Sequence, residues 1–125
     1  MLENVTPTPM IAVKDVAKAR RFYEETLGLE PLPTGYPDVM RYRAGGGIFV
    51  VYASEHAGTN QATALTWTVG DDLDKRVGEL GKKGVKFERY DLPGTTREGD
   101  IHVAGNIRNA WFKDPDGNIH GLSNV

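Results

Sequence analysis

Cysteine is absent from the sequence, and so is any long apolar run. Without a thiol the chain has no disulfide framework, no thiolate metal site and no thiol nucleophile. No segment approaches the roughly 18 apolar residues that a membrane span needs. The first residues, MLENVTPTPMIAV, lack the basic stretch and apolar core of a signal peptide. We therefore expect a cytoplasmic protein with no membrane partner.

A surplus of positive charge is also missing. The 125 residues carry a formal net charge of −2, and the pI calculated from the sequence is about 5.9. A nucleic-acid partner requires a basic face, so we expect none. The length favours one domain, residues 1–125, with a core of its own.

The most informative feature that is present is a repeat. The segment AVKDVAKARRFYEETLGL is matched by TVGDDLDKRVGELGKKGV, and each contains a strand ending in Val, an aspartate, a helix and a glycine before an apolar residue. We expect Asp15 to cap the first helix and Asp71 or Asp72 to cap the second. The repeat predicts two tandem modules, about 6–54 and 62–124.

Each module is predicted to follow the order strand, helix and three strands. Alternating apolar residues and turn signals place the strands. They are Thr8–Val13, Glu30–Leu32, Val39–Ala44, Ile48–Ala53, Thr63–Val69, Val85–Tyr90, Asn109–Lys113 and Ile119–Ser123, the last two joined by the turn DPDGN. The predicted fold is α+β, with two βαβββ modules whose mixed sheets curl into a cup and carry the helices on the outer face.

Three segments carry a resemblance to a known family. MIAVKDVAKARRFYEETLGLE, TWTVGDDLDKRVGELGKKGVKF and WFKDPDGN together resemble the vicinal oxygen chelate (VOC) superfamily. This group includes glyoxalase I, extradiol dioxygenases, fosfomycin resistance proteins and bleomycin resistance proteins. The resemblance covers nearly the whole chain and implies the fold. It does not imply one activity, because lyases, isomerases, dioxygenases, thiol transferases and binding proteins share this scaffold.

The resemblance also implies where a divalent metal would be held. Its ligands would come from the first strand of each half and from the last strand, four residues after the turn glycine. These positions fall on Thr8, Ala64 and Gly121, and a further ligand position falls near Val51 or Tyr52. None of these residues is a usual metal ligand. We therefore expect no metal and no other cofactor.

Displaced ligands are the alternative, and the candidates are His102, His120 and Glu98. In the last strand, alternation places Gly121 toward the cup and His120 toward the helices, unless Gly121 allows a bulge that reverses them. His102 lies with Glu98 and Asp100 in a long glycine-rich segment, which we expect to be a mobile surface loop; the alternative is a segment that closes over the cup. In this segment we expect Arg97 to pair with Glu98 and Asp100 at the rim of the site.

Strand alternation also predicts which residues line the cup. They are Thr8, Met10, Ala12, Ala64, Thr66, Thr68, Asn109, Trp111 and Gly121. Stacking on Trp111, with hydrogen bonds from Thr66, Thr68 and Asn109, suits a flat and partly apolar molecule. Simple core packing explains Trp111 equally well.

Three functions stay open. The first is a metal-free homodimeric protein of the bleomycin resistance kind that binds a small aromatic or amphipathic molecule. The second is a divalent-metal-dependent lyase, isomerase or dioxygenase that uses displaced ligands. The third is an interaction module whose cup is vestigial. In each case the cup is built within one chain or shared between two.

Overall fold

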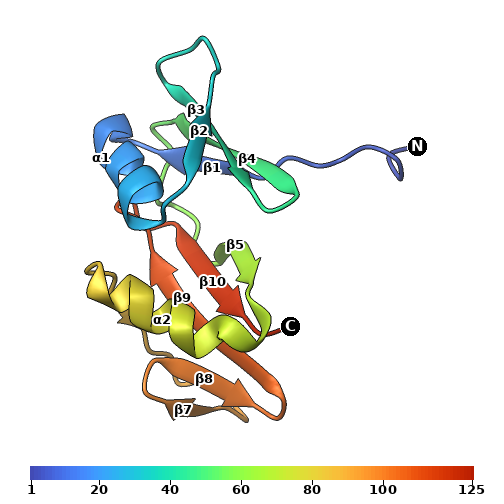
Figure 1. Ribbon diagram of the computed structural model, residues 1–125, viewed down its shortest axis with the longest axis vertical. Helices are drawn as coiled ribbons and strands as arrows, with labels where there is room; N and C mark the ends of the chain where they lie inside the picture. The colour runs from blue at the N-terminus through green and yellow to red at the C-terminus, as the bar shows by residue number, and fades with distance from the viewer. The chain divides into compact units, whose positions relative to one another are not determined.

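The computed structural model describes residues 1–125, which divide into two compact units, Met1–Ala57 and Gly58–Val125. The modules predicted from the sequence are 6–54 and 62–124. Each unit has a sheet and a helix of its own (Figure 1), so the predicted α+β class is confirmed. Both sheets contain parallel and antiparallel pairs, and both are open and uncurled, so the predicted curling of the sheets into a cup is wrong. Neither helix is long and apolar enough to cross a membrane.

The first unit has a four-stranded sheet in the order β1-β4-β3-β2, in which β1 and β4 are parallel. Its elements are β1 (Met10–Val13), α1 (Val16–Arg20), the π-helical turn η1 (Arg21–Thr26), β2 (Glu30–Leu32), β3 (Val39–Ala44) and β4 (Gly47–Ala53). As predicted, Asp15 caps α1, and its carboxylate accepts a 3.0 Å hydrogen bond from the backbone N–H of Lys18.

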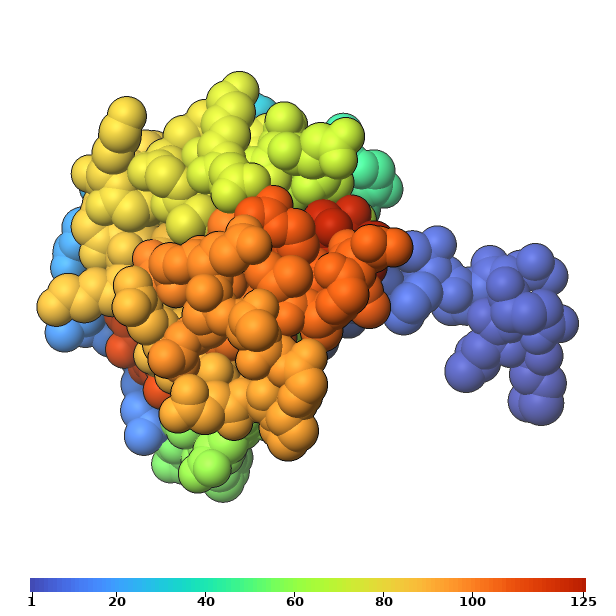
Figure 2. All heavy atoms as spheres, turned by 90° about the horizontal axis from the view of Figure 1, so that it is seen from below, coloured from blue at the N-terminus to red at the C-terminus, as the bar shows by residue number.

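The first strand begins later than predicted. Thr8 precedes β1, which starts at Met10, because Pro9 has no backbone N–H to donate to a strand ladder. The residues before β1 extend away from the first unit, and Figure 2 shows them in blue. Within β1, Ile11 and Val13 are buried and Met10 is exposed, so the alternation predicted for this strand holds from Met10 onward.

Aromatic side chains tie the helix of the first unit to its sheet. Tyr23 of η1 stacks on Tyr42 of β3, with ring centroids 5.8 Å apart, and both rings are buried. The hydroxyl of Tyr42 donates a 2.8 Å hydrogen bond to the carboxylate of Glu24. Burial raises the pKa of Tyr42, and the hydrogen bond to Glu24 adds to the effect, so this phenol stays a donor.

The second unit has a six-stranded sheet. Its elements are β5 (Thr63–Thr68), the 3₁₀ turn η2 (Gly70–Asp72), α2 (Leu73–Lys82), β6 (Phe87–Glu88), β7 (Thr96–Glu98), β8 (Ile101–Ala104), β9 (Ile107–Lys113) and β10 (Ile119–Ser123). The order is β5-β10-β9-β8-β7, and β6 also pairs with β9. The strands β5 and β10 are parallel.

The glycine-rich segment before β9 corrects the prediction of a mobile loop. It forms the hairpin β7–β8, which Figure 2 shows in orange at the surface of the second unit. Gly99 supplies the turn with a φ of +64°. The predicted pairing of Arg97 is also wrong: its guanidinium lies 3.1 Å from the carboxylate of Asp91, whereas Asp100 pairs with Arg89.

Helix α2 lies across β9 and β10 in Figure 1. Asp72 occupies the N-cap position, but its side chain makes no capping hydrogen bond. The predicted cap position is therefore correct, but the capping hydrogen bond does not form, and the 3₁₀ turn η2 leads into the helix. Arg108 of β9 holds the first turn of α2, since its guanidinium lies 2.8 Å from the carboxylate of Asp74 and 3.3 Å from that of Glu98.

The turn between β9 and β10 is organised by one buried carboxylate. Oδ1 of Asp114 accepts 2.9 Å hydrogen bonds from the backbone N–H groups of Asp116 and Asn118. Oδ2 of Asp114 accepts a 2.8 Å hydrogen bond from the amide of Asn118. Asp114 is only 4% exposed. The turn thus fixes the register of the two central strands.

Gly58 packs against this same turn, and we expect Gly58→Ala to destabilise the protein by about 2 kcal/mol. A Cβ at Gly58 would lie 2.5 Å from the carbonyl oxygen of Asp116, and the glycine has a φ of +77°. Gly35→Ala is the matched control, because Gly35 has a φ of +75° and nothing within 4 Å of the added atom. Urea denaturation of both variants makes the comparison. Equal losses would show that the contact with Asp116 contributes nothing.

Candidate functional site

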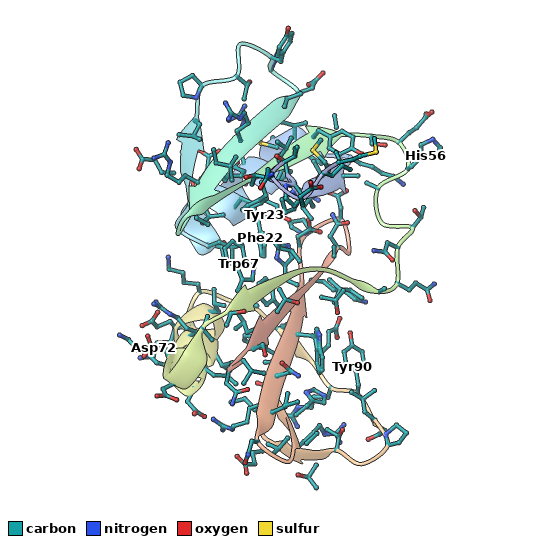
Figure 3. All side chains as sticks on the ribbon, turned by 90° about the vertical axis from the view of Figure 1, so that its right-hand side faces the viewer. Phe22, Tyr23, His56, Trp67, Asp72 and Tyr90 are labelled. Carbon is teal, nitrogen blue, oxygen red and sulfur yellow. The ribbon has the colours of Figure 1, made fainter.

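The second sheet has one face covered by α2 and one face away from it. Strand register places Thr66, Gly121 and Trp111 side by side on the face away from the helix, because Gly121 pairs with Thr66 on one side and with Trp111 on the other. Figure 3 shows Tyr90 on this side of the sheet, and Asp72 marks the start of α2 on the other side. We call this surface, which carries Thr66, Thr68, Asn109, Trp111, Gly121, His102 and Tyr90, the open face.

The missing side chain of Gly121 determines the centre of the open face. A Cβ at this position would lie 3.1 Å from the Oγ1 atom of Thr66 and 3.3 Å from the Nε1 atom of Trp111. Both contacts are tighter than ordinary packing, so any larger residue would displace one of these two polar groups. Gly121 therefore leaves room for a hydroxyl and an indole N–H to lie close to its bare backbone.

His120 lies on the opposite face, as strand alternation predicts. The β10 register shift falls between Ile119 and His120, so alternation is intact from His120 onward. Its imidazole stacks on Phe112, with ring centroids 5.0 Å apart, and is nearly parallel to the Trp67 indole at its edge, with ring centroids 6.2 Å apart. Its Nδ1 atom accepts a 3.1 Å hydrogen bond from Nε1 of Trp67. Burial lowers the pKa of His120 to about 4, so the ring is neutral at physiological pH.

His102 corrects the prediction of an exposed loop histidine. It lies in β8 on the open face, opposite Asn109 of β9, and is 2% exposed. Its Nε2 atom accepts a 2.9 Å hydrogen bond from the backbone N–H of Tyr90. The sequence signal was the alternation of Ile101 and Val103 between two glycines, which is typical of a short strand.

Three rings form a cluster on the open face. The ring centroids of His102 and Trp111 are 4.8 Å apart, those of Tyr90 and Trp111 are 5.6 Å apart, and those of Tyr90 and His102 are 5.8 Å apart. Burial raises the pKa of Tyr90, as does the nearby carboxylate of Glu88. Sequence analysis placed Tyr90 at the end of a predicted strand, Val85–Tyr90, but did not propose it as a site residue, and β6 in fact ends at Glu88.

A depression of about 460 Å³ lies beside the ring cluster. The segment between β6 and β7, together with the first part of β7, provides its walls. They are Tyr90, Asp91, Leu92, Pro93, Thr95 and Arg97. Arg97 donates a 3.3 Å hydrogen bond to the carbonyl oxygen of Tyr90, which fixes the backbone of this segment. Tyr90 is the wall that the depression shares with the ring cluster.

The remaining residues predicted to line a cup are distributed over both units. Met10 and Ala12 share one face of β1, opposite the buried Ile11 and Val13. Ala64 lies at the register shift of β5, where Ile119 pairs with Thr63 and His120 pairs with Leu65. Thr68 pairs with Ser123, so it shares the open face with Thr66.

The side chains do not fit a divalent metal. The chain contains no group of three or more His, Asp or Glu side chains placed so that they could hold a metal ion. The two histidines considered as displaced ligands, His102 and His120, lie on opposite faces of the sheet, and Glu98 pairs with Arg108 on the helix side. A divalent ion needs several nitrogen or oxygen donors that converge on one point. No reaction step is therefore assigned to a metal.

Comparison with known proteins gives one family. A family model described as Glyoxalase/Bleomycin resistance protein/Dioxygenase superfamily matches residues 6–120. No curated protein sequence matches the chain. The match spans both units of the structure and every residue of the open face except Gly121.

Solved structures show the same fold at low sequence identity. The chain superposes with a TM-score of 0.71 on a glyoxalase/bleomycin resistance protein/dioxygenase from Alicyclobacillus acidocaldarius, at 21% identity over 96% of this chain and 90% of that one. The fosfomycin resistance protein FosX from Mesorhizobium loti gives a TM-score of 0.69, at 15% identity over 100% of this chain and 94% of that one. Lactoylglutathione lyase from Agrobacterium tumefaciens gives a TM-score of 0.69, at 13% identity over 96% of this chain and 92% of that one. At these identities the comparison shows the fold alone.

Proposed function

This chain belongs to the glyoxalase/bleomycin resistance protein/dioxygenase superfamily, and we propose that within it the chain is a metal-free protein that binds a small aromatic or amphipathic molecule. The observation that carries the proposal is the centre of the open face. There Gly121 stands where the family resemblance implies a carboxylate ligand, and a Cβ at this position would lie 3.1 Å from the Oγ1 atom of Thr66 and 3.3 Å from the Nε1 atom of Trp111.

The open face has the groups that such binding needs. The half-buried indole of Trp111 offers a flat apolar surface for stacking, a contact typically worth about 0.5 to 1.5 kcal/mol beyond its buried area. The indole N–H of Trp111, the hydroxyl of Thr66 and the amide of Asn109 supply hydrogen bonds around it. None of these groups is charged, which favours an uncharged or amphipathic molecule over a polyanion.

Ligand binding is tested with 2-naphthol as the probe, because it is planar, amphipathic and uncharged. Titration into the ¹⁵N-labelled protein is expected to shift the indole N–H resonance of Trp111, one of two tryptophans in the chain. Trp111→Leu is expected to weaken binding at least about tenfold. Trp67→Phe is the control, since Trp67 lies on the helix side and bonds to His120. An unchanged affinity in Trp111→Leu would refute the assigned site.

Metal content is a separate test of the same proposal. Protein purified without an affinity tag or chelator is expected to contain no stoichiometric metal, and Mn²⁺, Ni²⁺, Zn²⁺ and Fe²⁺ are expected to leave its melting temperature unchanged. About one equivalent per chain with a metal-dependent rise in melting temperature would overturn it. Ala substitutions at His102 and His120 would then identify the ligands.

The second candidate is a divalent-metal-dependent lyase, isomerase or dioxygenase. It is favoured by structural similarity to proteins named as a lactoylglutathione lyase and a fosfomycin resistance protein. The placement of His102 and His120 on opposite faces of one sheet argues against it. The metal measurement above decides between the two.

Assembly and location belong to the proposal as well. We propose a cytoplasmic homodimer, as often occurs in families of this fold. Sedimentation equilibrium of the full chain is the measurement, and the expected mass is twice the 13.7 kDa of one chain. A monomer at all concentrations tested would contradict this part of the proposal and leave the binding site untouched.

A further inference from the structure

We propose that His102 is the polar anchor of the binding site, and that its Nδ1–H group donates a hydrogen bond to an acceptor atom of an uncharged planar ring seated beside Tyr90. This inference rests on the proposed function, since it names the chemical class of the ligand and the residue that selects it. It assigns to His102 the role of a hydrogen-bond donor, in place of the metal ligand considered from the sequence.

The protonation of His102 follows from its single hydrogen bond. Its Nε2 atom accepts from the backbone N–H of Tyr90 at 2.9 Å. An imidazole nitrogen that accepts carries no proton, so the ring is neutral and its proton is on Nδ1. His102 therefore presents one N–H donor.

This donor has no partner within the protein. The Nδ1 atom of His102 is buried without a hydrogen-bond partner, and the residue is 2% exposed. Buried polar side-chain atoms are nearly always hydrogen-bonded, because a donor without a partner loses its hydrogen bond to water and gains no other. The Nδ1–H group is therefore a buried donor that a ligand acceptor would satisfy once the side chains covering it move.

The surroundings of His102 define the shape of that ligand. Tyr90 and Trp111 both lie against the imidazole, with centroids 5.8 and 4.8 Å from it. Tyr90 also forms one wall of the 460 Å³ depression. His102 does not itself line the depression, so Tyr90 is the shared contact, and a flat ring that reaches Nδ1 of His102 has to displace the Tyr90 side chain. A planar molecule of one or two fused rings fits this volume.

The charges around the depression favour a neutral ligand. Arg97 and Asp91 both line the depression, and the guanidinium of Arg97 pairs with the carboxylate of Asp91 at 3.1 Å. Burial raises the pKa of the Tyr90 phenol and keeps it uncharged. With the two opposite charges paired and the imidazole neutral, the ligand class is an uncharged aromatic ring that carries a ring nitrogen or a carbonyl oxygen as acceptor.

Two probes of nearly identical shape test this inference. Quinoline has one ring nitrogen as acceptor and is uncharged at pH 7.5, whereas naphthalene has none. We expect quinoline to shift the Trp111 indole resonance with an affinity about tenfold higher than that of naphthalene. Equal affinities would overturn the role of His102 and leave the proposed function standing. If neither probe shifts the resonance, both the inference and the proposed function fail.

The variant His102→Gln isolates the donor. The glutamine amide oxygen reaches the position of Nε2 and still accepts from the Tyr90 N–H, but no donor remains at the position of Nδ1. We expect His102→Gln to bind quinoline and naphthalene with equal affinity, whatever the loss of the imidazole ring does to the binding of both. His56→Gln, a change in a turn of the first unit, is the control and should keep the preference. A preference that survives in His102→Gln refutes the inference.

A measurement on the unmodified protein covers the case in which His102→Gln does not fold. Long-range ¹H–¹⁵N spectra of the histidine rings identify the protonated nitrogen of each imidazole. We expect the His102 ring to be protonated at Nδ1, and this ¹⁵N resonance to shift with quinoline but not with naphthalene. A ring protonated at Nε2, or no shift with quinoline, would refute the inference.

Discussion

Acidification from about pH 6.5 to about pH 4 is expected to cost the folded protein about 3 kcal/mol through His120 alone. Burial between Trp67 and Phe112 lowers the pKa of His120 to about 4, against an ordinary value of 6.5. The unfolded chain therefore takes up a proton in this range before the folded chain does. Stability is fully present above about pH 6.5 and decreases as the pH falls to about 4.

The difference between wild type and His120→Asn isolates this contribution. The asparagine oxygen can take the position of Nδ1 and accept from the Trp67 indole, but the side chain does not titrate. Urea denaturation at half-unit pH steps is expected to show a smaller stability for the variant at pH 7, because the stacked ring is lost. The gap between the two proteins should close as the pH falls. A gap that is independent of pH would contradict the lowered pKa.

Replacement of Asp114 is expected to lower the free energy of unfolding by about 3 kcal/mol, since hydrogen bonds to a charged group contribute about 1.5 to 3 kcal/mol each and do not add fully. In Asp114→Ala, the N–H groups of Asp116 and Asn118 and the Asn118 amide lose their acceptor in a site that is 4% exposed at Asp114. Thermal and urea denaturation measure the loss.

A reversed pair separates the role of hydrogen bonding from that of volume. Asp114→Asn keeps an oxygen for the backbone N–H groups, but its amide faces the Asn118 amide, so an intermediate loss is expected. Adding Asn118→Asp reverses donor and acceptor and is expected to recover part of that loss. Asp91→Ala, at a carboxylate that is 97% exposed, should change stability by less than about 0.5 kcal/mol. No recovery in the double variant would refute the importance of this hydrogen bond.

Local patterns predict most of the first unit. The bounds of β2 and β3 agree with the sequence prediction, and β4 begins one residue earlier than predicted. Regular alternation and clear turn signals bound these strands, so short-range information was sufficient. The prediction that the first strand begins at Thr8 was wrong, because Pro9 and not hydrophobicity determines where β1 begins.

In the second unit, several features depend on contacts between distant segments and could not be predicted from local patterns. The hairpin β7–β8 is rich in glycine and charge, and only pairing with β9 makes it a strand pair. The ring cluster joins Tyr90, His102 and Trp111 from three separate segments, and no spacing in the sequence announces that contact. The open face was predictable at Thr66, Trp111 and Gly121, where simple alternation applies. Its hydrogen-bond donor at His102 was not.

The parallel pairs described above also determine when each unit can fold during synthesis. In the first unit Met10 pairs with Val50, and in the second Thr66 pairs with Gly121. A sheet closed by its first and last strands stays incomplete until the last strand has left the ribosome. The first unit is thus able to close early, while β5, held only by β10, waits for the final strand. Until then the backbone edge of β5 is unpaired and is open to pairing with another chain.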